Sequence, residues 1–210
     1  THLAHDFVLV PARQGSFWEY AARDVVYATS RKYFTHGLWP GLQIPLAHGA
    51  TSVLHRAPPR PDLVLDTLAR YGVSKLISVP TVLRGLLDVP EVPALPTLDL
   101  VISASGKIPP DLFARFAARF GMEILDSIGS SEITYEWIAN RPAEARRGSL
   151  GKPVFGYEIR LVDEAGRDVG EPHVPGEAWV RSETACFYYW RKYRQSRETF
   201  IGEWTRTGDH

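Results

Sequence analysis

Two adjacent hydroxyls and a carboxylate, Ser130, Ser131 and Glu132, end a segment of small residues that begins at Asp126. A mostly apolar run over 122–125 precedes this segment and predicts a strand, so the small residues are expected to form the turn that leaves it. Hydroxyls hydrogen-bond phosphate oxygens, and Mg²⁺ prefers one or two carboxylates together with phosphates and water. These residue types therefore suit a phosphate and its magnesium ion. The simpler alternative is a loop whose hydroxyls cap a helix, with Glu132 near the first turn.

A second carboxylate, Asp209, stands in the tripeptide Thr207-Gly208-Asp209. A carboxylate can accept hydrogen bonds from both ribose hydroxyls, as an acidic residue does in dinucleotide-binding folds. Either motif alone is weak evidence, because small-residue turns and Thr-Gly-Asp both occur by chance. Their order and spacing make the pair informative.

Together the two motifs resemble signatures of the adenylate-forming enzymes, the superfamily of acyl-CoA synthetases and adenylation domains. The segments that continue the resemblance lie at 148–153, 156–163, 176–181, 189–190, 199–200 and 202–209. The resemblance thus covers nearly the whole chain, and it implies ATP or AMP, Mg²⁺ and coenzyme A as cofactors. It further implies that Glu132 and Ser131 are catalytic and that Glu132 is the metal ligand. The cofactor-binding residues that it implies are Ser105, Gly106, Asp126, Ser127, Ile128, Gly129, Ser130, Ser131 and Asp209.

Within the superfamily, the chain is most similar to benzoate- and hydroxybenzoate-CoA ligases. The loop 34–38 and the segment 137–142 carry this similarity. It implies a small-molecule partner, an aromatic carboxylic acid, in a flat pocket with few polar groups. The residues that would bind the acid are Phe34, Thr35, His36, Gly129 and Tyr135. Tyr135 stands where these ligases commonly have histidine, and the alternative for His36 is a loop histidine satisfied by a backbone group.

Short apolar strands alternate with helical segments in the first part of the chain, which predicts a mainly parallel sheet flanked by helices. The expected strands are 25–28, 51–54, 76–79, 100–103 and 122–125. The expected helices are 61–71, 80–87 and 110–120, with further helix within 5–23 and a stretch at 37–48 interrupted by two prolines. Alternation at 157–162 and 176–181 then predicts a small antiparallel β subdomain. The fold class is α/β, with an α/β subdomain over 1–145 and the β subdomain over 146–210.

The composition points to an ordinary globular protein. Lys plus Arg and Asp plus Glu each total 24, so nothing indicates binding to nucleic acid or to an anionic membrane. The single cysteine excludes an internal disulfide, and no uncharged apolar run approaches 18 residues. We expect a cytoplasmic protein.

The 210 residues contain no Gly-rich phosphate loop of the kind that the family carries. We therefore expect an internal fragment of the large N-terminal domain of an aryl-CoA ligase, inactive by itself. Two alternatives stay open: an adenylation domain that loads an aryl acid onto a carrier protein, and a non-catalytic nucleotide- or ligand-binding module.

Overall fold

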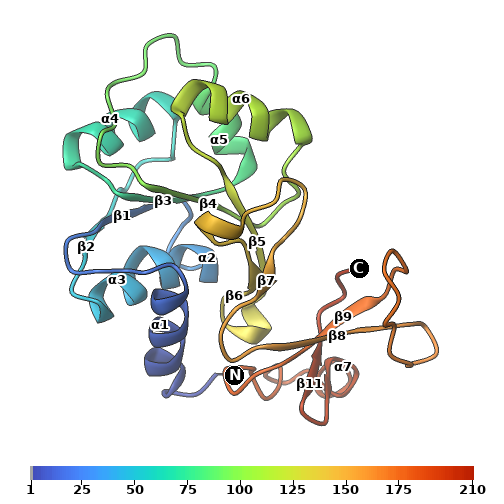
Figure 1. The fold of residues 1–210 in the computed structure, drawn as a ribbon. Helices are drawn as coiled ribbons and strands as arrows, with labels where there is room; N and C mark the ends of the chain where they lie inside the picture. The colour runs from blue at the N-terminus through green and yellow to red at the C-terminus, as the bar shows by residue number, and fades with distance from the viewer. Residues whose placement is uncertain (1) are drawn as a thin grey trace.

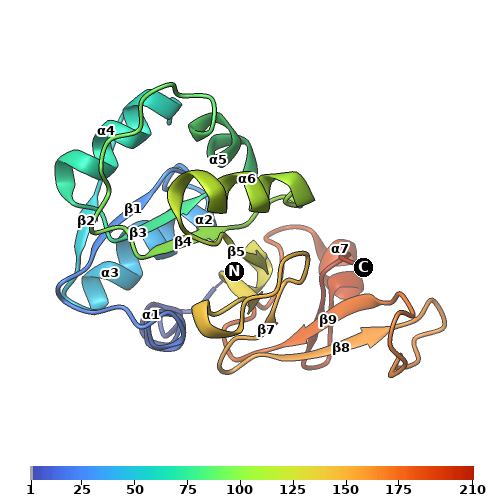
Figure 2. The ribbon, with the colours of Figure 1, turned by 45° about the horizontal axis from the view of Figure 1, so that its top comes forward.

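The computed structural model describes residues 2–210 and contains two sheets (Figures 1 and 2). The larger sheet has seven strands in the order β2-β1-β3-β4-β5-β6-β7, and the smaller has four in the order β10-β11-β9-β8. The strands of the larger sheet are β1 (Val25–Ala28), β2 (Thr51–Val53), β3 (Lys75–Ser78), β4 (Leu100–Ser103), β5 (Leu125–Gly129), β6 (Glu136–Ala139) and β7 (Lys152–Pro153). Those of the smaller sheet are β8 (Glu158–Val162), β9 (Glu177–Arg181), β10 (Phe200–Ile201) and β11 (Trp204–Arg206).

Strands β1 to β5 pair in parallel, which confirms the predicted α/β class. The prediction for the fifth strand was wrong by several residues. Its ladder with β4 begins only at Leu125 and Asp126, and its antiparallel ladder with β6 continues to Gly129. Asp126 to Gly129, expected as part of a turn, are therefore strand, because two neighbours rather than one supply their backbone hydrogen bonds.

Helices cover both faces of this sheet (Figure 1). One face carries α4 (Pro61–Tyr71), α5 (Pro80–Leu86) and α6 (Pro110–Phe120), whose apolar residues share one buried cluster with β3 and β4. Both α4 and α6 begin with proline and end at a glycine with positive φ, Gly72 at 60° and Gly121 at 68°. Proline suits the first helical turn and glycine the left-handed residue that ends a helix, so both helices match their predicted bounds.

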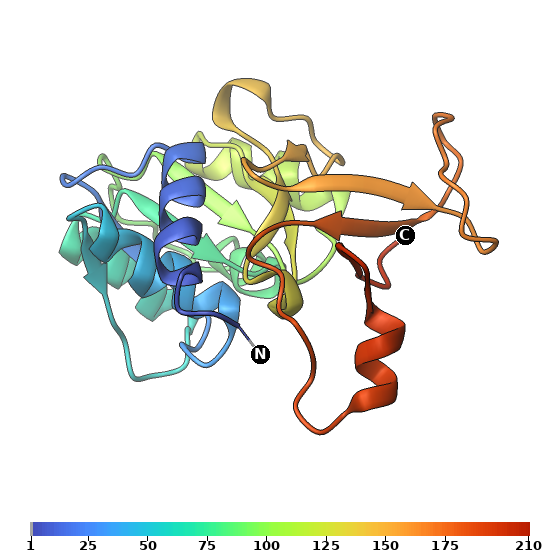
Figure 3. The same cartoon turned by 90° about the horizontal axis from the view of Figure 1, so that it is seen from below.

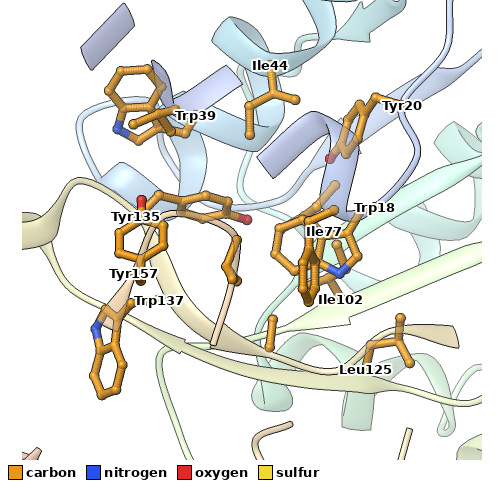
Figure 4. Close-up of a cluster of buried hydrophobic side chains, with 14 of the residues drawn as sticks. Trp18, Tyr20, Trp39, Ile44, Ile77, Ile102, Leu125, Tyr135, Trp137 and Tyr157 are labelled. Carbon is orange, nitrogen blue, oxygen red and sulfur yellow. The ribbon is translucent and has the colours of Figure 1, made fainter. Parts of the chain in front are cut away.

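The opposite face carries α1 (Asp6–Phe17) and a continuous helical stretch. That stretch comprises α2 (Thr35–Leu38), the π-helical turn η1 (Trp39–Gln43) and α3 (Ile44–Ala47). Pro40 and Pro45, which were expected to interrupt it, lie at the starts of η1 and α3, so the type of helix changes at each proline while the helical stretch continues. Together these elements bury the second cluster, shown in Figure 4.

The smaller sheet confirms the predicted antiparallel region (Figure 3). Its strands β8 and β9 pair from Glu158 with Arg181 to Val162 with Glu177. The short helix α7 (Tyr193–Thr199) was not predicted, because it buries no residue and so has no apolar stripe. Strand β7 joins the larger sheet through β6, and the division of the chain after residue 145 stays a prediction.

Among residues 2–210, every helix is too short or too polar to cross a lipid bilayer.

Candidate active site

The acidic turn leaves the larger sheet directly after β5. Ser130 is extended, and residues 131–133 form a single 3₁₀ turn, η2, which ends at Thr134 with φ of 84°. The Ser130 hydroxyl caps nothing there, so the helix-capping alternative has no support in this geometry. Within the described chain, the Ser130 Oγ atom is buried and has no hydrogen-bond partner. Such a group is available to a ligand oxygen.

The Glu132 carboxylate lies on the same turn and is held by a partner far away in sequence. The Tyr189 hydroxyl donates a hydrogen bond of 2.8 Å to its Oε1 atom. Ser131 is exposed, and its carbonyl oxygen accepts a hydrogen bond of 2.6 Å from His2 Nε2. The turn therefore presents one carboxylate and one exposed hydroxyl at the carboxyl end of a parallel strand, where α/β sheets bind ligands.

Beside this turn lies a cavity of about 560 Å³, within the range of small-molecule sites. It is bounded by the segment after β4, by β5 and by the last residues of the chain. Seven of the predicted cofactor-binding residues line it: Ser105, Gly106, Asp126, Ser127, Ile128, Gly129 and Asp209. The other two, Ser130 and Ser131, lie on the adjacent turn with Glu132. The structure thus gathers the set into one cavity and one neighbouring turn.

The Thr207-Gly208-Asp209 segment is fixed against β9. The Thr207 hydroxyl donates to the Ala178 carbonyl at 2.7 Å, and the Ala178 N–H donates to the Asp209 carbonyl at 2.8 Å. Burial raises the pKa of the Asp209 carboxyl, His210 lowers it and the charge of Glu132 raises it further. The two motif carboxylates therefore lie within electrostatic reach of each other.

The buried carboxyls of this region have raised pKa values. Burial raises the pKa of Asp126 to about 6, against a hydrogen bond from the Ser127 N–H that lowers it. On the next strand, Glu136 is only 2% exposed. Burial raises its pKa to about 8, the Ser127 hydroxyl lowers it and the charge of Asp126 raises it. Glu136 is consequently a neutral carboxylic acid over most of the physiological pH range.

The predicted acid-binding residues divide into a buried group and an exposed one. His36 on α2 is 6% exposed and Tyr135 is 1% exposed, and their ring centroids lie 6.4 Å apart. Phe34, in contrast, is 57% exposed and packs on Tyr33 rather than on this pair. Thr35 begins α2 and is partly buried. Figure 4 shows Tyr135 in the same buried cluster as Trp39 and Ile44.

His36 does not have the backbone partner that the simpler alternative required. Its Nδ1 atom hydrogen-bonds the Ser30 hydroxyl at 3.0 Å. Burial, with a smaller contribution from Lys32, lowers the His36 pKa to about 4, so the ring is neutral at neutral pH. Among residues 2–210, neither His36 Nε2 nor Tyr135 Oη has a hydrogen-bond partner, although both atoms are buried.

Gly129 lies between the cavity and the backbone of Tyr135. It lines the cavity, and a Cβ atom at this position would lie 2.5 Å from the Tyr135 carbonyl oxygen. No side chain fits in that gap, so glycine is required for β5 to approach Tyr135 so closely. Strand β5 therefore borders the cavity and lies directly against the backbone of Tyr135.

Two residues of this region were not predicted from sequence. Tyr189 gives no local signal, because its contact with Glu132 joins two different sheets. Glu136 did give a local signal, because it is a carboxylate between the aromatic residues Tyr135 and Trp137 in a strand-like segment.

The fold and the site define an α/β nucleotide-binding domain of the adenylate-forming type. Residues 2–190 match the family described as AMP-binding enzyme, so the chain belongs to the AMP-binding enzyme family. It is 39% identical to the benzoate–CoA ligase of Thauera aromatica over 188 residues, which cover 89% of this chain and 36% of the relative.

Two solved structures of related proteins have the same fold. The anthranilate CoA ligase AuaEII, in complex with anthranoyl-AMP, has a TM-score of 0.94 and 34% identity, over 99% of this chain and 41% of that chain. A benzoate CoA ligase from Burkholderia xenovorans has a TM-score of 0.92 and 35% identity, over 99% and 43%. The chain thus spans well under half the length of these relatives.

The residues present fit a magnesium nucleotide. The described residues hold no cluster of three or more His, Cys, Asp or Glu side chains that would bind a metal by itself. A lone carboxylate such as Glu132 suits Mg²⁺, which commonly takes one or two protein carboxylates and completes its shell with phosphate and water.

Proposed function

We propose that the full-length protein is an ATP-dependent aryl-CoA ligase. It activates a benzoate-type carboxylic acid as an acyl-adenylate, releases pyrophosphate, and transfers the acyl group to the thiol of coenzyme A. The observation that carries this proposal is the cavity beside the Glu132 turn, which is lined by Ser105, Asp126, Gly129 and Asp209 among others.

Each predicted residue has a definite task in this reaction. Glu132 holds Mg²⁺, Ser130 and Ser131 donate hydrogen bonds to the phosphate, and Asp209 accepts hydrogen bonds from the ribose hydroxyls. The magnesium nucleotide supplies an electrophilic α-phosphorus and, after reaction, AMP as a good leaving group. The strands bring these groups together before the substrates arrive, so little reorganisation is needed during the reaction.

The acid is recognised by an aromatic pocket with two polar atoms. The free Nε2 atom of His36 and Oη atom of Tyr135 suit a hydroxyl or amino substituent of the acid. A long alkyl chain would leave both polar atoms unsatisfied, which disfavours fatty acids. The cytoplasmic location stays a prediction from composition.

The test is acid-dependent exchange of pyrophosphate into ATP by the full-length protein. Benzoate and its hydroxy and amino derivatives should support exchange, and thioester should form when coenzyme A is added. Exchange without thioester formation on coenzyme A, but with loading of a phosphopantetheine carrier, would favour the carrier-loading alternative. Nucleotide binding without any exchange over a panel of acids would favour the non-catalytic module.

A further inference from the structure

The acidic turn is held by residues 184–189, which lie in the connection between β9 and α7. We call these residues the clamp segment. It follows β9 and contacts η2 through backbone and side chain. The Cys186 N–H donates to the Glu132 carbonyl at 2.7 Å, and the Thr134 hydroxyl donates to the Thr184 carbonyl at 2.6 Å. These bonds tie the turn to the clamp segment.

The clamp segment also reaches the functional atoms of the turn. Its last residue, Tyr189, donates the 2.8 Å hydrogen bond to Glu132 Oε1. Tyr189 is itself held in place, because its ring packs on Phe200 with centroids 5.3 Å apart. Its N–H donates to the Ser196 hydroxyl of α7 at 2.9 Å. The phenol is thus a fixed donor rather than a mobile surface group.

We propose that Tyr189 is a positioning residue that orients the Glu132 carboxylate for the divalent cation. This inference rests on the proposed function, in which Glu132 is the cation ligand. The hydrogen bond occupies Oε1 and fixes the rotation of the carboxylate, which would leave Oε2 to ligate a cation. Partners that orient a metal ligand in this way typically contribute about 10- to 100-fold to metal affinity.

The hydrogen bond between Tyr189 and Glu132 links the two sheets. Glu132 lies in the turn that follows β5 of the larger sheet, whereas Tyr189 lies in the connection between β9 and α7. Cation affinity therefore depends on how the smaller sheet is seated against the larger one. A change in the clamp segment alters the cation site without touching the nucleotide cavity.

The experiment measures Mn²⁺ binding to the full-length protein with ATP, by the electron paramagnetic resonance signal of free Mn²⁺. Tyr189→Phe keeps the ring on Phe200 and removes only the donor, and we expect it to weaken Mn²⁺ binding by about 10-fold. Tyr193→Phe on α7 is the matched control and should bind as the wild type does. The Tyr189→Phe protein should also need more Mg²⁺ for half-maximal exchange.

A double-mutant cycle separates positioning from general damage. In the Glu132→Gln background, Tyr189→Phe should cause no further loss of Mn²⁺ affinity, because the tyrosine acts only through the carboxylate. Phe200→Leu disturbs the packing of Tyr189 but keeps its hydroxyl. It should lower the melting temperature and weaken Mn²⁺ binding by less than Tyr189→Phe does, because the donor is retained but its packing is loosened.

The outcomes distinguish this inference from the proposed function. If Glu132→Gln weakens Mn²⁺ binding and Tyr189→Phe does not, the inference is overturned and the role of Glu132 stands. Equal losses from Tyr189→Phe in both backgrounds would also overturn it. If Glu132→Gln itself binds Mn²⁺ as the wild type does, the metal assignment of the proposed function fails, and the inference fails with it.

Discussion

The imidazole of His36 and the phenol of Tyr135 lie in the interior with their centroids 6.4 Å apart and their planes inclined at 42°. In the described structure each ring keeps one buried polar atom, Nε2 and Oη, that bonds to no protein group. Unsatisfied buried polar atoms are costly in a core and are expected where a ligand completes the bonding. In the proposed function, this pair is where the acid's ring substituent binds.

Tyr135→Phe in the full-length protein should change the ranking among benzoates. Loss of the hydroxyl removes one hydrogen bond, so a hydroxy- or aminobenzoate should lose about 1 kcal/mol, roughly fivefold in kcat/KM, relative to benzoate. Tyr33→Phe, at an exposed position, is the control. Pyrophosphate exchange over a panel of acids checks the prediction. Preference for octanoate over every benzoate would refute the aromatic pocket.

Glu132→Gln and Asp209→Asn should weaken different parts of nucleotide use. The first removes the anionic metal ligand with little change of shape, and the second weakens acceptance of the ribose hydroxyls. Losses of about 1.5–3 kcal/mol are expected for hydrogen bonds to a charged group. The rate of pyrophosphate exchange, measured as a function of Mg²⁺ concentration and of ATP concentration, checks this. Asp66→Asn, on the exposed side of α4, should behave as the wild type, and wild-type kinetics in both test variants would contradict the assignment.

Gly129→Ala should destabilise the fold, because its Cβ atom would overlap the Tyr135 carbonyl oxygen at 2.5 Å. Overpacking of this kind costs about 1–3 kcal/mol. Gly170→Ala is the control, since nothing lies within 4 Å of a Cβ atom at that position. Urea denaturation measures the free energy of unfolding of both variants. Equal stability of the two variants would show that β5 does not approach Tyr135 so closely.

Gly106→Ala should act on binding rather than on stability. The nearest atom to its Cβ is Pro80 Cγ at 3.9 Å, an ordinary van der Waals contact, so the fold should tolerate the methyl group. Because Gly106 lines the 560 Å³ cavity, that methyl group takes space from the ligand. We expect weaker nucleotide binding by calorimetry with the midpoint of urea denaturation unchanged. Unchanged nucleotide affinity would place the ligand elsewhere.

The stability of the protein should fall as pH rises, through Glu136. Its folded pKa of about 8 exceeds the ordinary value of 4.5, so the folded protein keeps a proton that the unfolded chain releases. The stabilisation is complete below about pH 4.5 and is lost as pH rises towards 8. Glu136→Gln should flatten this fall and raise the free energy of unfolding at pH 8 by at least about 1 kcal/mol. Parallel curves for both proteins between pH 5 and 8 would contradict it.

A verified preparation of these 210 residues should show no acid-dependent pyrophosphate exchange. The sequence contains no Gly-rich phosphate loop, so the charge that develops on the α-phosphate lacks a main stabiliser. The full-length protein is the positive control. Robust exchange by the 210-residue chain would refute both the fragment interpretation and the residue roles proposed for the site.

Local rules in the sequence determined much of the fold. The bounds of α4 and α6 followed from a proline in the first turn and a glycine after the last, signals contained within each segment. The strands at 25–28 and 100–103 followed from short apolar runs. The residues that line the cavity were expected from the resemblance to the family, and the structure places seven of them together there.

Other features were decided only by tertiary structure. Strand β5 extends to Gly129 because β6 pairs with it, and no local signal announced that partner. The hydrogen bond from Tyr189 to Glu132, the proximity of the His36 and Tyr135 rings, and the raised pKa of Glu136 all depend on contacts between distant elements. Spacing along the chain specifies which face of an element a side chain occupies, whereas burial and partners arise only when separate elements pack together.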